Sequence, residues 1–329
     1  MKVAIFGAGA IGAYLGVRMH QAGAEVSLIA RGAHLDAMRK NGVTLKTDDE
    51  TVTVRPFVTD HARDAGIQDY VFISLKAHTL PHVVDDIAGM MGPETTLITA
   101  MNGVPYWYFY GVNLPWRDRT IPSVDPGGAL WKKLPPERVI GSVLYPWNEI
   151  IAPGVVEQSA SNRFVIGEPD GSTSTRIKHL SAIMQAGKLD APITLDIRTE
   201  LWIKLWGNLS FNPISVLTGA TIDRLTQDEG LRVVAREMMV EAEKVANALG
   251  IRFPIDVDQR MAVTKLGGAR KTSTLQDFER GKSLETEPLL GAVVELGEWA
   301  GIDLPFCRAI LALVRERERT LRTTSGDGE

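Results

Sequence analysis

The sequence holds a single cysteine, Cys307, in 329 residues. One cysteine cannot form a disulfide within the chain, which is typical of a protein in a reducing cytoplasm. No apolar run approaches the roughly 20 residues that a membrane-spanning helix needs, so no membrane span is expected. The six histidines also lack metal-site spacing: His78 and His82 form the one i, i+4 pair, without an HExxH pattern, and no metal site is predicted.

The chain has no excess of positive charge. Its 36 basic and 40 acidic residues give a net charge of −4, which argues against a nucleic acid or an anionic membrane as the main partner. The length instead suggests two domains with sizeable cores, and we expect the boundary at residues 196 and 197.

The most informative feature is the start of the chain, MKVAIFGAGAIG, where a β-branched apolar run meets a glycine-rich turn. In a GxGxxG motif the first glycine allows the tight turn, the second lets a pyrophosphate approach the backbone, and the third lets the next helix pack closely. A helix over 13–22 and a strand over 24–30 follow, as the motif requires. The sequence therefore predicts a dinucleotide bound by Gly7, Ala8, Gly9, Ala10, Ile11 and Gly12. The alternative is a glycine-rich turn without a ligand.

Arg31 follows the second predicted strand. Enzymes that use NAD usually carry Asp or Glu there to bind the ribose 2′-hydroxyl, whereas a guanidinium can pair with a 2′-phosphate. NADP(H) is therefore favoured over NAD(H). The alternative is an ordinary exposed arginine, and the sequence does not fix the directions of His34, Arg39 and Lys40.

Strands and helices alternate up to about residue 100, with strand-like runs over 43–49 and 51–59, a strand over 69–76, a helix over 80–91 and a strand over 95–103. This alternation predicts a doubly wound parallel sheet, with the ligand at the carboxyl ends of the strands. Lys76 and Asn102 lie at two of those ends, where they could contact cofactor or substrate. Further strands over 155–168 complete this Rossmann-type domain.

The segment 106–150 is rich in aromatic residues, proline and glycine, and it carries four of the seven tryptophans. So much aromatic surface argues against disorder. A lid over the site and a subunit contact are equal hypotheses for it.

From residue 197 the sequence is mostly helical. Within LWIKLWGNLSFNP, Lys204, Asn208 and Asn212 are spaced by four and form one stripe, while apolar residues cover most of the remaining circumference. Unpaired polar groups in such surroundings cost about 1–3 kcal/mol each, so the stripe is expected to line a polar cleft. The alternative is that Lys204 reaches solvent and the asparagines cap loops. Pro213 predicts that the helix ends near Asn212.

A second constellation runs from Ser273 to Glu285. Ser273 and Gln276 have the spacing of a capping box, and Glu285 precedes a helix expected to start near Pro288. Both features could therefore have a structural role only, as a helix cap and as a charge that favours the helix dipole.

Taken together, these motifs resemble the ketopantoate reductases (2-dehydropantoate 2-reductases). The resemblance rests on the glycine motif, Arg31, Lys76-Ala77, Asn102-Gly103, the run from Lys204 to Asn212, and Ser273-Thr-Leu-Gln-Asp with Glu285. It implies a Rossmann domain followed by an all-helical domain like that of 6-phosphogluconate dehydrogenase, with the active site between them. A homodimer formed through the helical domain is a further expectation from the family.

The resemblance also implies a mechanism. NADPH would deliver a hydride to the C2 ketone of ketopantoate, and Lys204 would protonate the developing alkoxide. Asn102, Asn208, Asn212, Ser273 and Glu285 would orient the substrate, with Lys204 and Glu285 as the catalytic pair. The glycine loop, Arg31, Lys76 and Asn102 would hold the cofactor.

Two departures from the family pattern concern the substrate. The aromatic segment after Asn102 is longer than usual, and the common Glu-x-Asp-x-x-Asn-Gly run is replaced by Glu285-Thr-Glu-Pro-Leu-Leu-Gly291. A bulkier 2-oxo acid is thus an alternative acceptor. Two other functions stay open: a dehydrogenase of β-hydroxy acids or opine-type amines, and a protein that senses NADPH without catalysis.

Overall fold

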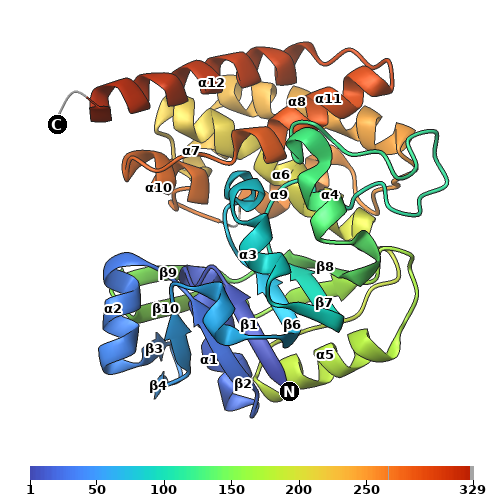
Figure 1. Cartoon of the computed structure of the whole chain (residues 1–329). Helices are drawn as coiled ribbons and strands as arrows, with labels where there is room; N and C mark the ends of the chain where they lie inside the picture. Colours follow the sequence, from blue (N-terminus) through green and yellow to red (C-terminus); the bar gives the residue numbers. More distant parts are fainter. Residues whose placement is uncertain (266, 327–329) are drawn as a thin grey trace. The chain divides into compact units, whose positions relative to one another are not determined.

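The structure is a computed structural model that describes residues 1–265 and 267–326 (Figure 1). The chain folds into two compact units. Unit 1 comprises Met1–Met101 and Pro105–Ile197, and unit 2 comprises Asn102–Val104 and Arg198–Glu329. The predicted boundary at residues 196 and 197 put residues 102–104 in the first domain. They belong to unit 2 in part because the Val104 N–H donates a hydrogen bond to the Pro288 carbonyl, at 2.9 Å.

Unit 1 is built on a seven-stranded sheet of order β11-β8-β7-β6-β1-β2-β5. The strands are β1 Lys2–Phe6, β2 Glu25–Ile29, β5 Phe57–Thr59, β6 Gln68–Ile73, β7 Met91–Thr99, β8 Val139–Leu144 and β11 Phe164–Gly167. All pair in parallel except β11, which is antiparallel to β8. This confirms the predicted parallel sheet, and it places β1 between β6 and β2.

A second, four-stranded sheet of order β4-β3-β10-β9 was not expected from the sequence. Its strands are β3 Val43–Lys46, β4 Thr51–Val54, β9 Trp147–Ala152 and β10 Val155–Ala160. The run over 51–59 was predicted as one strand, but it divides at Arg55-Pro56 into β4 of the small sheet and β5 of the large one. Pro56 has no N–H for a ladder hydrogen bond, which favours a break there.

The helices of unit 1 are α1 Ala10–Gln21, α2 Gly32–Asn41, α3 Val84–Ala88, α4 Ala129–Lys133 and α5 Thr175–Ala186. The helix predicted over 80–91 was too long. A 3₁₀ turn, Ala77–His82, contains Pro81 and precedes the short α3. Proline removes a backbone donor and interrupts a regular helix, and β7 then begins at Met91, earlier than expected.

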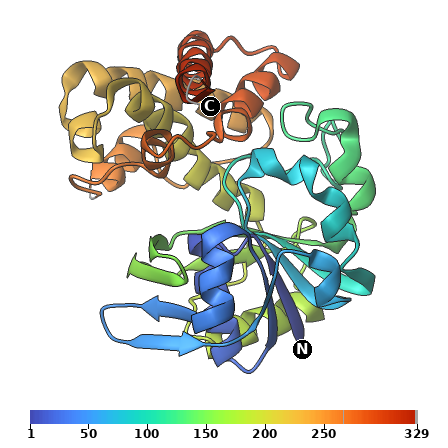
Figure 2. The same ribbon diagram turned by 60° about the vertical axis from the view of Figure 1, so that its left-hand side comes forward.

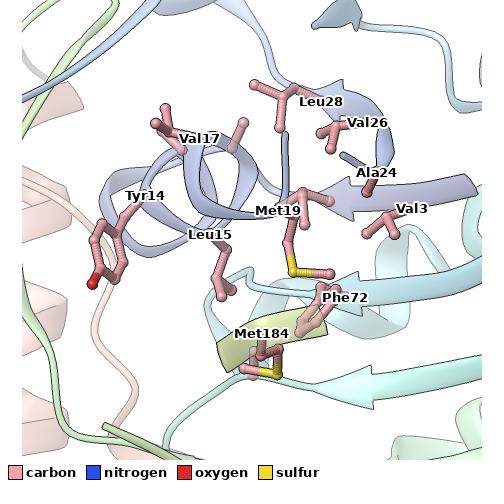
Figure 3. Packing of buried hydrophobic residues seen from close by; sticks show 14 of the residues in the cluster. Val3, Tyr14, Leu15, Val17, Met19, Ala24, Val26, Leu28, Phe72 and Met184 are labelled. Carbon is pink, nitrogen blue, oxygen red and sulfur yellow. The ribbon is translucent and has the colours of Figure 1, made fainter. Parts of the chain in front are cut away.

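Helix α1 is anchored on the sheet by apolar side chains. Tyr14, Leu15, Val17 and Met19 are fully buried, and Figure 3 shows them among side chains of neighbouring strands such as Val3 and Leu28. Each such side chain contributes about 1.5–3 kcal/mol by leaving water. This packing fixes the start of α1 at the end of β1.

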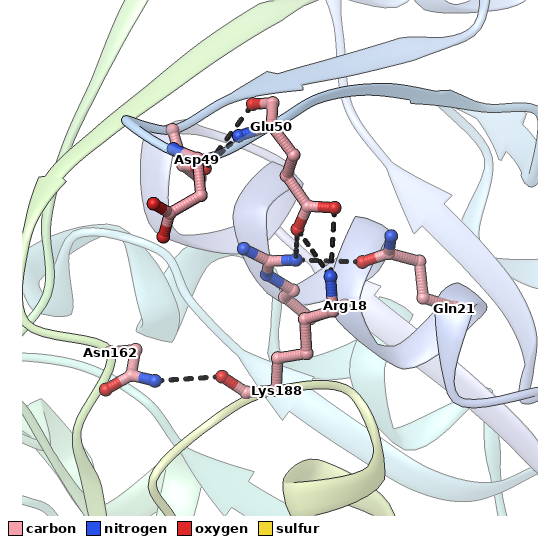
Figure 4. Close-up of polar contacts among 7 residues, drawn as sticks. Arg18, Gln21, Asp49, Glu50, Asn162 and Lys188 are labelled. Carbon is pink, nitrogen blue, oxygen red and sulfur yellow. Dashed lines mark hydrogen bonds and ion pairs between the residues drawn. The ribbon is translucent and has the colours of Figure 1, made fainter.

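A charged network ties α1 to two other segments of unit 1 (Figure 4). Arg18 is only 5% exposed and pairs with Glu50 at 2.5 Å. Lys188, which follows α5, pairs with the same carboxylate at 2.9 Å. These contacts lower the pKa of Glu50, first through its hydrogen bond from Arg18 and then through that from Lys188. The carboxylate therefore compensates a buried guanidinium.

The first four residues of the aromatic segment are part of the interior of unit 1. Tyr106, Trp107, Tyr108 and Phe109 are at most 2% exposed. Tyr106 Oη donates to the Leu134 carbonyl at 2.8 Å, and Trp107 Nε1 donates to Thr99 Oγ1 at 3.0 Å. These four rings therefore pack inside unit 1, and the lid and the subunit contact stay predictions for the rest of the segment.

Unit 2 is helical, as predicted (Figure 2). Its helices are α6 Ile197–Thr218, α7 Ile222–Gln227, α8 Glu229–Ala248, α9 Val257–Lys265, α10 Ser273–Glu279, α11 Ala292–Trp299 and α12 Pro305–Gly326, with a π-helical turn at Glu287–Gly291. Among the described residues, no helix is both long and apolar enough to span a membrane.

The prediction that α6 ends near Asn212 was wrong, because the helix continues through Pro213 to Thr218. Proline leaves one carbonyl of the preceding turn without its donor. The surrounding packing outweighs that cost, since residues 209–216 are all buried. The Ser215 hydroxyl also donates to the Asn212 carbonyl, at 2.6 Å, within the same turn.

Candidate functional site

The candidate residues fall into two sets, one in each unit. In unit 1 the glycine loop joins β1 to α1 at the carboxyl end of β1. Gly7 has φ +101°, a conformation that glycine tolerates best. A Cβ on Gly9 would meet no atom within 4 Å, and no side chain caps the N-terminus of α1. Open space next to a helix N-terminus suits a pyrophosphate.

Gly12 has a different task, which is to let α1 approach the loop. A Cβ there would lie 2.2 Å from the Gly7 carbonyl oxygen and 2.7 Å from Ser74 Oγ. Ser74 follows β6 and donates to the same carbonyl at 2.9 Å. No pattern in the sequence marks Ser74, because only the strand order puts the end of β6 beside the glycine loop.

The basic residues near the second strand differ in the contacts that their side chains already make. Arg31 is exposed and precedes α2 as its N-cap residue, at the carboxyl end of β2. Arg39 is engaged elsewhere, with Asp60 at 2.8 Å. His34 is engaged by the β9–β10 turn, because Nδ1 accepts the Gly154 N–H at 2.9 Å, and burial lowers the pKa of its imidazole. Arg31 is therefore the better candidate for a 2′-phosphate.

Lys76 follows β6 and is half-buried at the start of the 3₁₀ turn Ala77–His82. Its carbonyl accepts hydrogen bonds from the N–H and the hydroxyl of Thr79, the latter at 2.7 Å. The turn thus fixes the backbone of Lys76 at the carboxyl end of β6, the strand next to β1.

In unit 2 the stripe lies on α6. The apolar side of this helix is anchored by Trp202, Trp206 and Leu209, all fully buried. Trp206 stacks on Phe253, with ring centroids 4.0 Å apart, and its indole N–H donates to the Met239 carbonyl of α8 at 2.7 Å. This packing fixes the rotation of α6, and with it the stripe of Lys204, Asn208 and Asn212.

The three residues of the stripe differ in exposure. Lys204 and Asn208 are half-buried, and Asn212 is only 6% exposed. Burial lowers the pKa of the Lys204 ammonium to about 8, against the opposing effect of the negative charge of Glu285. A lysine with such a pKa holds its proton at neutral pH and releases it more readily than an ordinary lysine, which suits a proton donor.

Glu285 is brought to this stripe by the chain before the π-helical turn. It is 4% exposed, and Asn102 Nδ2 lies at hydrogen-bonding distance, 3.5 Å, from Glu285 Oε2. A Cβ on Gly103 would lie 2.6 Å from the Pro288 carbonyl oxygen, so glycine allows the segment 102–104 to approach the turn. Residues far apart in the sequence are thereby joined in one unit. π-Helical turns occur frequently at functional sites.

Ser273 is placed less directly. It is exposed on the first turn of α10, and Thr272 is the actual N-cap, accepting the Leu275 N–H at 3.1 Å. The predicted capping box was therefore wrong by one residue. The Thr272 hydroxyl also lies 2.6 Å from the Ser215 hydroxyl of α6. This pairing holds the N-terminus of α10 against α6, one turn beyond Asn212.

The arrangement in unit 2 therefore combines an ammonium of lowered pKa, a buried carboxylate and three amides. Such a set can bind a small polar molecule and give it a proton. Within the described part of the chain, no group of three or more His, Cys, Asp or Glu residues could hold a metal ion.

Comparison with known families agrees with these features. The family model "Ketopantoate reductase PanE/ApbA" matches residues 3–171, and the model "Ketopantoate reductase PanE/ApbA C terminal" matches residues 196–318. A protein of Mesorhizobium japonicum named 2-dehydropantoate 2-reductase is 48% identical over 316 residues, which are 96% of this chain and 97% of the relative.

Solved structures share the fold over the whole chain. A PanE/ApbA family ketopantoate reductase from Ralstonia eutropha is 28% identical with a TM-score of 0.84, covering 98% of this chain and 100% of the other. A D-mandelate dehydrogenase, solved with NADH and anilino(oxo)acetate, is 20% identical with a TM-score of 0.84 over the same shares. The second likeness concerns the fold alone.

Proposed function

Because the chain belongs to the ketopantoate reductase (PanE/ApbA) family, we propose that it reduces the C2 ketone of 2-dehydropantoate with NADPH and that Lys204 is the general acid. The chain is an oxidoreductase of this family. The observation that supports these roles is the stripe on α6. Burial lowers the pKa of Lys204 there to about 8, and the negative charge of Glu285 acts on it in the opposite direction.

The glycine loop fits a dinucleotide. The free space at Gly9 and the uncapped N-terminus of α1 would receive the pyrophosphate. Arg31 would pair with the 2′-phosphate, and Lys76 and Asn102 would bind further polar groups of the cofactor. NADPH, when bound, supplies the hydride that reduces the ketone.

The residues of unit 2 supply the rest of the chemistry. The Lys204 ammonium stabilises negative charge as it develops on the substrate oxygen, and then gives that oxygen a proton from Nζ. The Glu285 carboxylate keeps Lys204 protonated and accepts a hydrogen bond from the substrate hydroxyl. Asn102, Asn208, Asn212 and Ser273 orient the substrate through amide and hydroxyl groups.

The structure of the segment that departs from the common family pattern bears on the acceptor. Leu290, which stands where the family commonly has asparagine, is only 1% exposed and belongs to the interior of unit 2. Leucine in place of the asparagine therefore removes a polar group without adding an exposed apolar surface that could bind a larger acid. This observation favours ketopantoate over a bulkier 2-oxo acid.

Steady-state oxidation of NADPH, with NADH in parallel, tests the function. The assay uses ketopantoate and a panel of bulkier 2-oxo acids, including aromatic ones. Fast turnover with ketopantoate and NADPH is the expected result. Activity confined to another acid would reassign the substrate, and NADPH binding without turnover on any acid would leave a sensing protein. The homodimer stays a prediction, which sedimentation equilibrium would test.

A further inference from the structure

The last helix of the chain reaches the segment that carries Glu285. This segment, residues 284–287, has no regular secondary structure before Thr286, so its own backbone does not fix Glu285. Leu284 is 3% exposed and packs in a cluster with Val216 of α6 and Val314 of α12. Helix α12 therefore packs against this segment through the apolar contact between Val314 and Leu284.

Two charged residues of α12, one acidic and one basic, then contact the residues on either side of Glu285. The Glu318 carboxylate accepts the Leu284 N–H at 3.3 Å and the Thr286 hydroxyl at 3.4 Å. One turn earlier, Arg315 forms a two-fold pair with Glu287: Nε and Nη2 each lie 2.7 Å from a carboxylate oxygen. Bidentate pairs of this kind fix geometry as well as charge.

The Glu287 carboxylate lies directly over the π-helical turn. A Cβ on Gly291 would lie 2.2 Å from Glu287 Oε2 and 3.6 Å from Arg315 Nη2. A side chain at this position would have to displace the Glu287 carboxylate. Glu287, two residues after Glu285, is thus held between Arg315 and the π-helical turn at Gly291.

We propose that α12 is the positioning element for Glu285, with Arg315 and Glu318 holding the backbone on either side of that residue through Glu287, Leu284 and Thr286. The inference rests on the proposed function, since it gives Glu285 a role in the reaction. Arg315 and Glu318 are positioning residues and do not themselves contact the substrate.

The position of Glu285 affects catalysis because its charge acts on the pKa of Lys204. The charge of Glu285 raises the pKa of the ammonium against the effect of burial. A displaced Glu285 would therefore let that pKa fall, and the enzyme would lose its proton donor at a lower pH. A purely structural role of α12 would lower the amount of folded protein without moving this pH.

The test compares the variants Arg315→Met and Glu318→Gln with the control variant Arg308→Met. Arg308 precedes Arg315 by seven residues on α12, and its ion pair with Asp303, at 3.4 Å, does not involve the segment around Glu285. We expect kcat to fall by up to about 100-fold in the first two variants, as misplacement by about 1 Å can cause. The upper pH limit of kcat should also move down, while the Kd of NADPH stays unchanged. Arg308→Met should leave all three as in the wild type.

Two more variants separate positioning from general damage. Gly291→Ala should reproduce the loss seen in Arg315→Met, because its methyl group displaces the Glu287 carboxylate. The exchanged pair, Glu287→Arg with Arg315→Glu, should restore part of kcat and return the pH limit toward the wild type. A loss of kcat with an unmoved pH limit and no rescue would overturn the proposal.

Hydrogen exchange of residues 284–291 provides a readout that does not depend on catalysis. Faster exchange in Arg315→Met and Glu318→Gln, but not in Arg308→Met, is expected, and equal exchange in all proteins would overturn the proposal. If Lys204→Ala keeps normal turnover, the proposed acid is wrong, whereas the exchange rates still report whether α12 holds the segment.

Discussion

At the scale of single residues, Lys204 is governed by two opposing effects. Burial disfavours its charge, and the carboxylate of Glu285 favours it. Burial is the larger effect, so the pKa is lowered to about 8. At pH 7 about nine in ten molecules would still hold the proton. The residue is therefore charged when the substrate oxygen needs stabilising, yet closer to releasing its proton than a surface lysine.

The pH dependence of reduction follows from this value. A general acid must be protonated, so kcat for reduction should be constant below about pH 8 and fall about tenfold per pH unit above it. Oxidation of the hydroxy acid, which needs the neutral amine, should rise over the same range. A pH profile of both directions measures this, and a reduction rate that is flat up to about pH 10, the range of an ordinary lysine, would contradict it.

Removal of the side chain gives the most direct test of its role. Lys204→Ala should lower kcat by about two to four orders of magnitude, the usual contribution of general acid catalysis. Lys244→Ala, which removes an exposed lysine of α8, serves as the control and should leave kcat unchanged. Near-normal turnover of Lys204→Ala would remove this residue from the mechanism.

Arg31 should discriminate between the two nicotinamide cofactors. A charged hydrogen bond contributes about 1.5–3 kcal/mol, so Arg31→Ala should raise the Kd of NADPH by about 10- to 150-fold. The Kd of NADH should stay within about twofold, because that cofactor has no 2′-phosphate. Fluorescence titration measures both, with Lys40→Ala as an exposed control from the same region. Equal weakening of both cofactors would exclude the 2′-phosphate role.

At the scale of elements, the strand–loop–helix unit β1–α1 uses its glycines for two purposes. Gly9 borders open space, whereas Gly12 touches the backbone of its own loop. Gly12→Ala should therefore lower the melting temperature of the free protein, and Gly9→Ala should not. Both should weaken NADPH binding, the second because its methyl group occupies the place of the pyrophosphate. Calorimetry of each variant with and without NADPH measures the difference, and an unchanged melting temperature of Gly12→Ala would contradict it.

The elements that the sequence predicted best are those with a strong local pattern. The strands β1, β2 and β6 are mostly apolar runs, and each lies at or close to a range that the sequence predicted. Proline was the weaker guide. Pro81 shortened a predicted helix, while Pro213 failed to end one, because packing around α6 outweighs the lost hydrogen bond.

At the scale of the whole molecule, charge compensation inside unit 1 contributes to stability. Glu50→Gln would leave the buried Arg18 without its counter-charge and should lower the free energy of unfolding by about 1–2 kcal/mol at pH 7. Glu94→Gln, which changes an exposed carboxylate, is the control.

The effect of Glu50 should depend on pH in a defined direction. Because the pKa of Glu50 is lowered in the folded state from 4.5, its stabilising contribution is present above pH 4.5 and is lost as pH falls through the lowered value. The wild type and Glu50→Gln should therefore differ at pH 7 and converge as pH falls below the lowered pKa of Glu50. Thermal melts over a series of pH values from 7 downward check this, and a constant difference would contradict it.

The sequence by itself determined the parallel sheet, the glycine loop, the helical second half and the stripe on α6, because each is written in local residue order and periodicity. Only the tertiary structure decided that Asn102 meets Glu285 and that Ser74 supports Gly7. It also decided that residues 106–109 are interior and that α12 reaches Leu284 and Thr286. These contacts join residues far apart in the chain, and neither spacing nor composition encodes which distant surfaces will pack together.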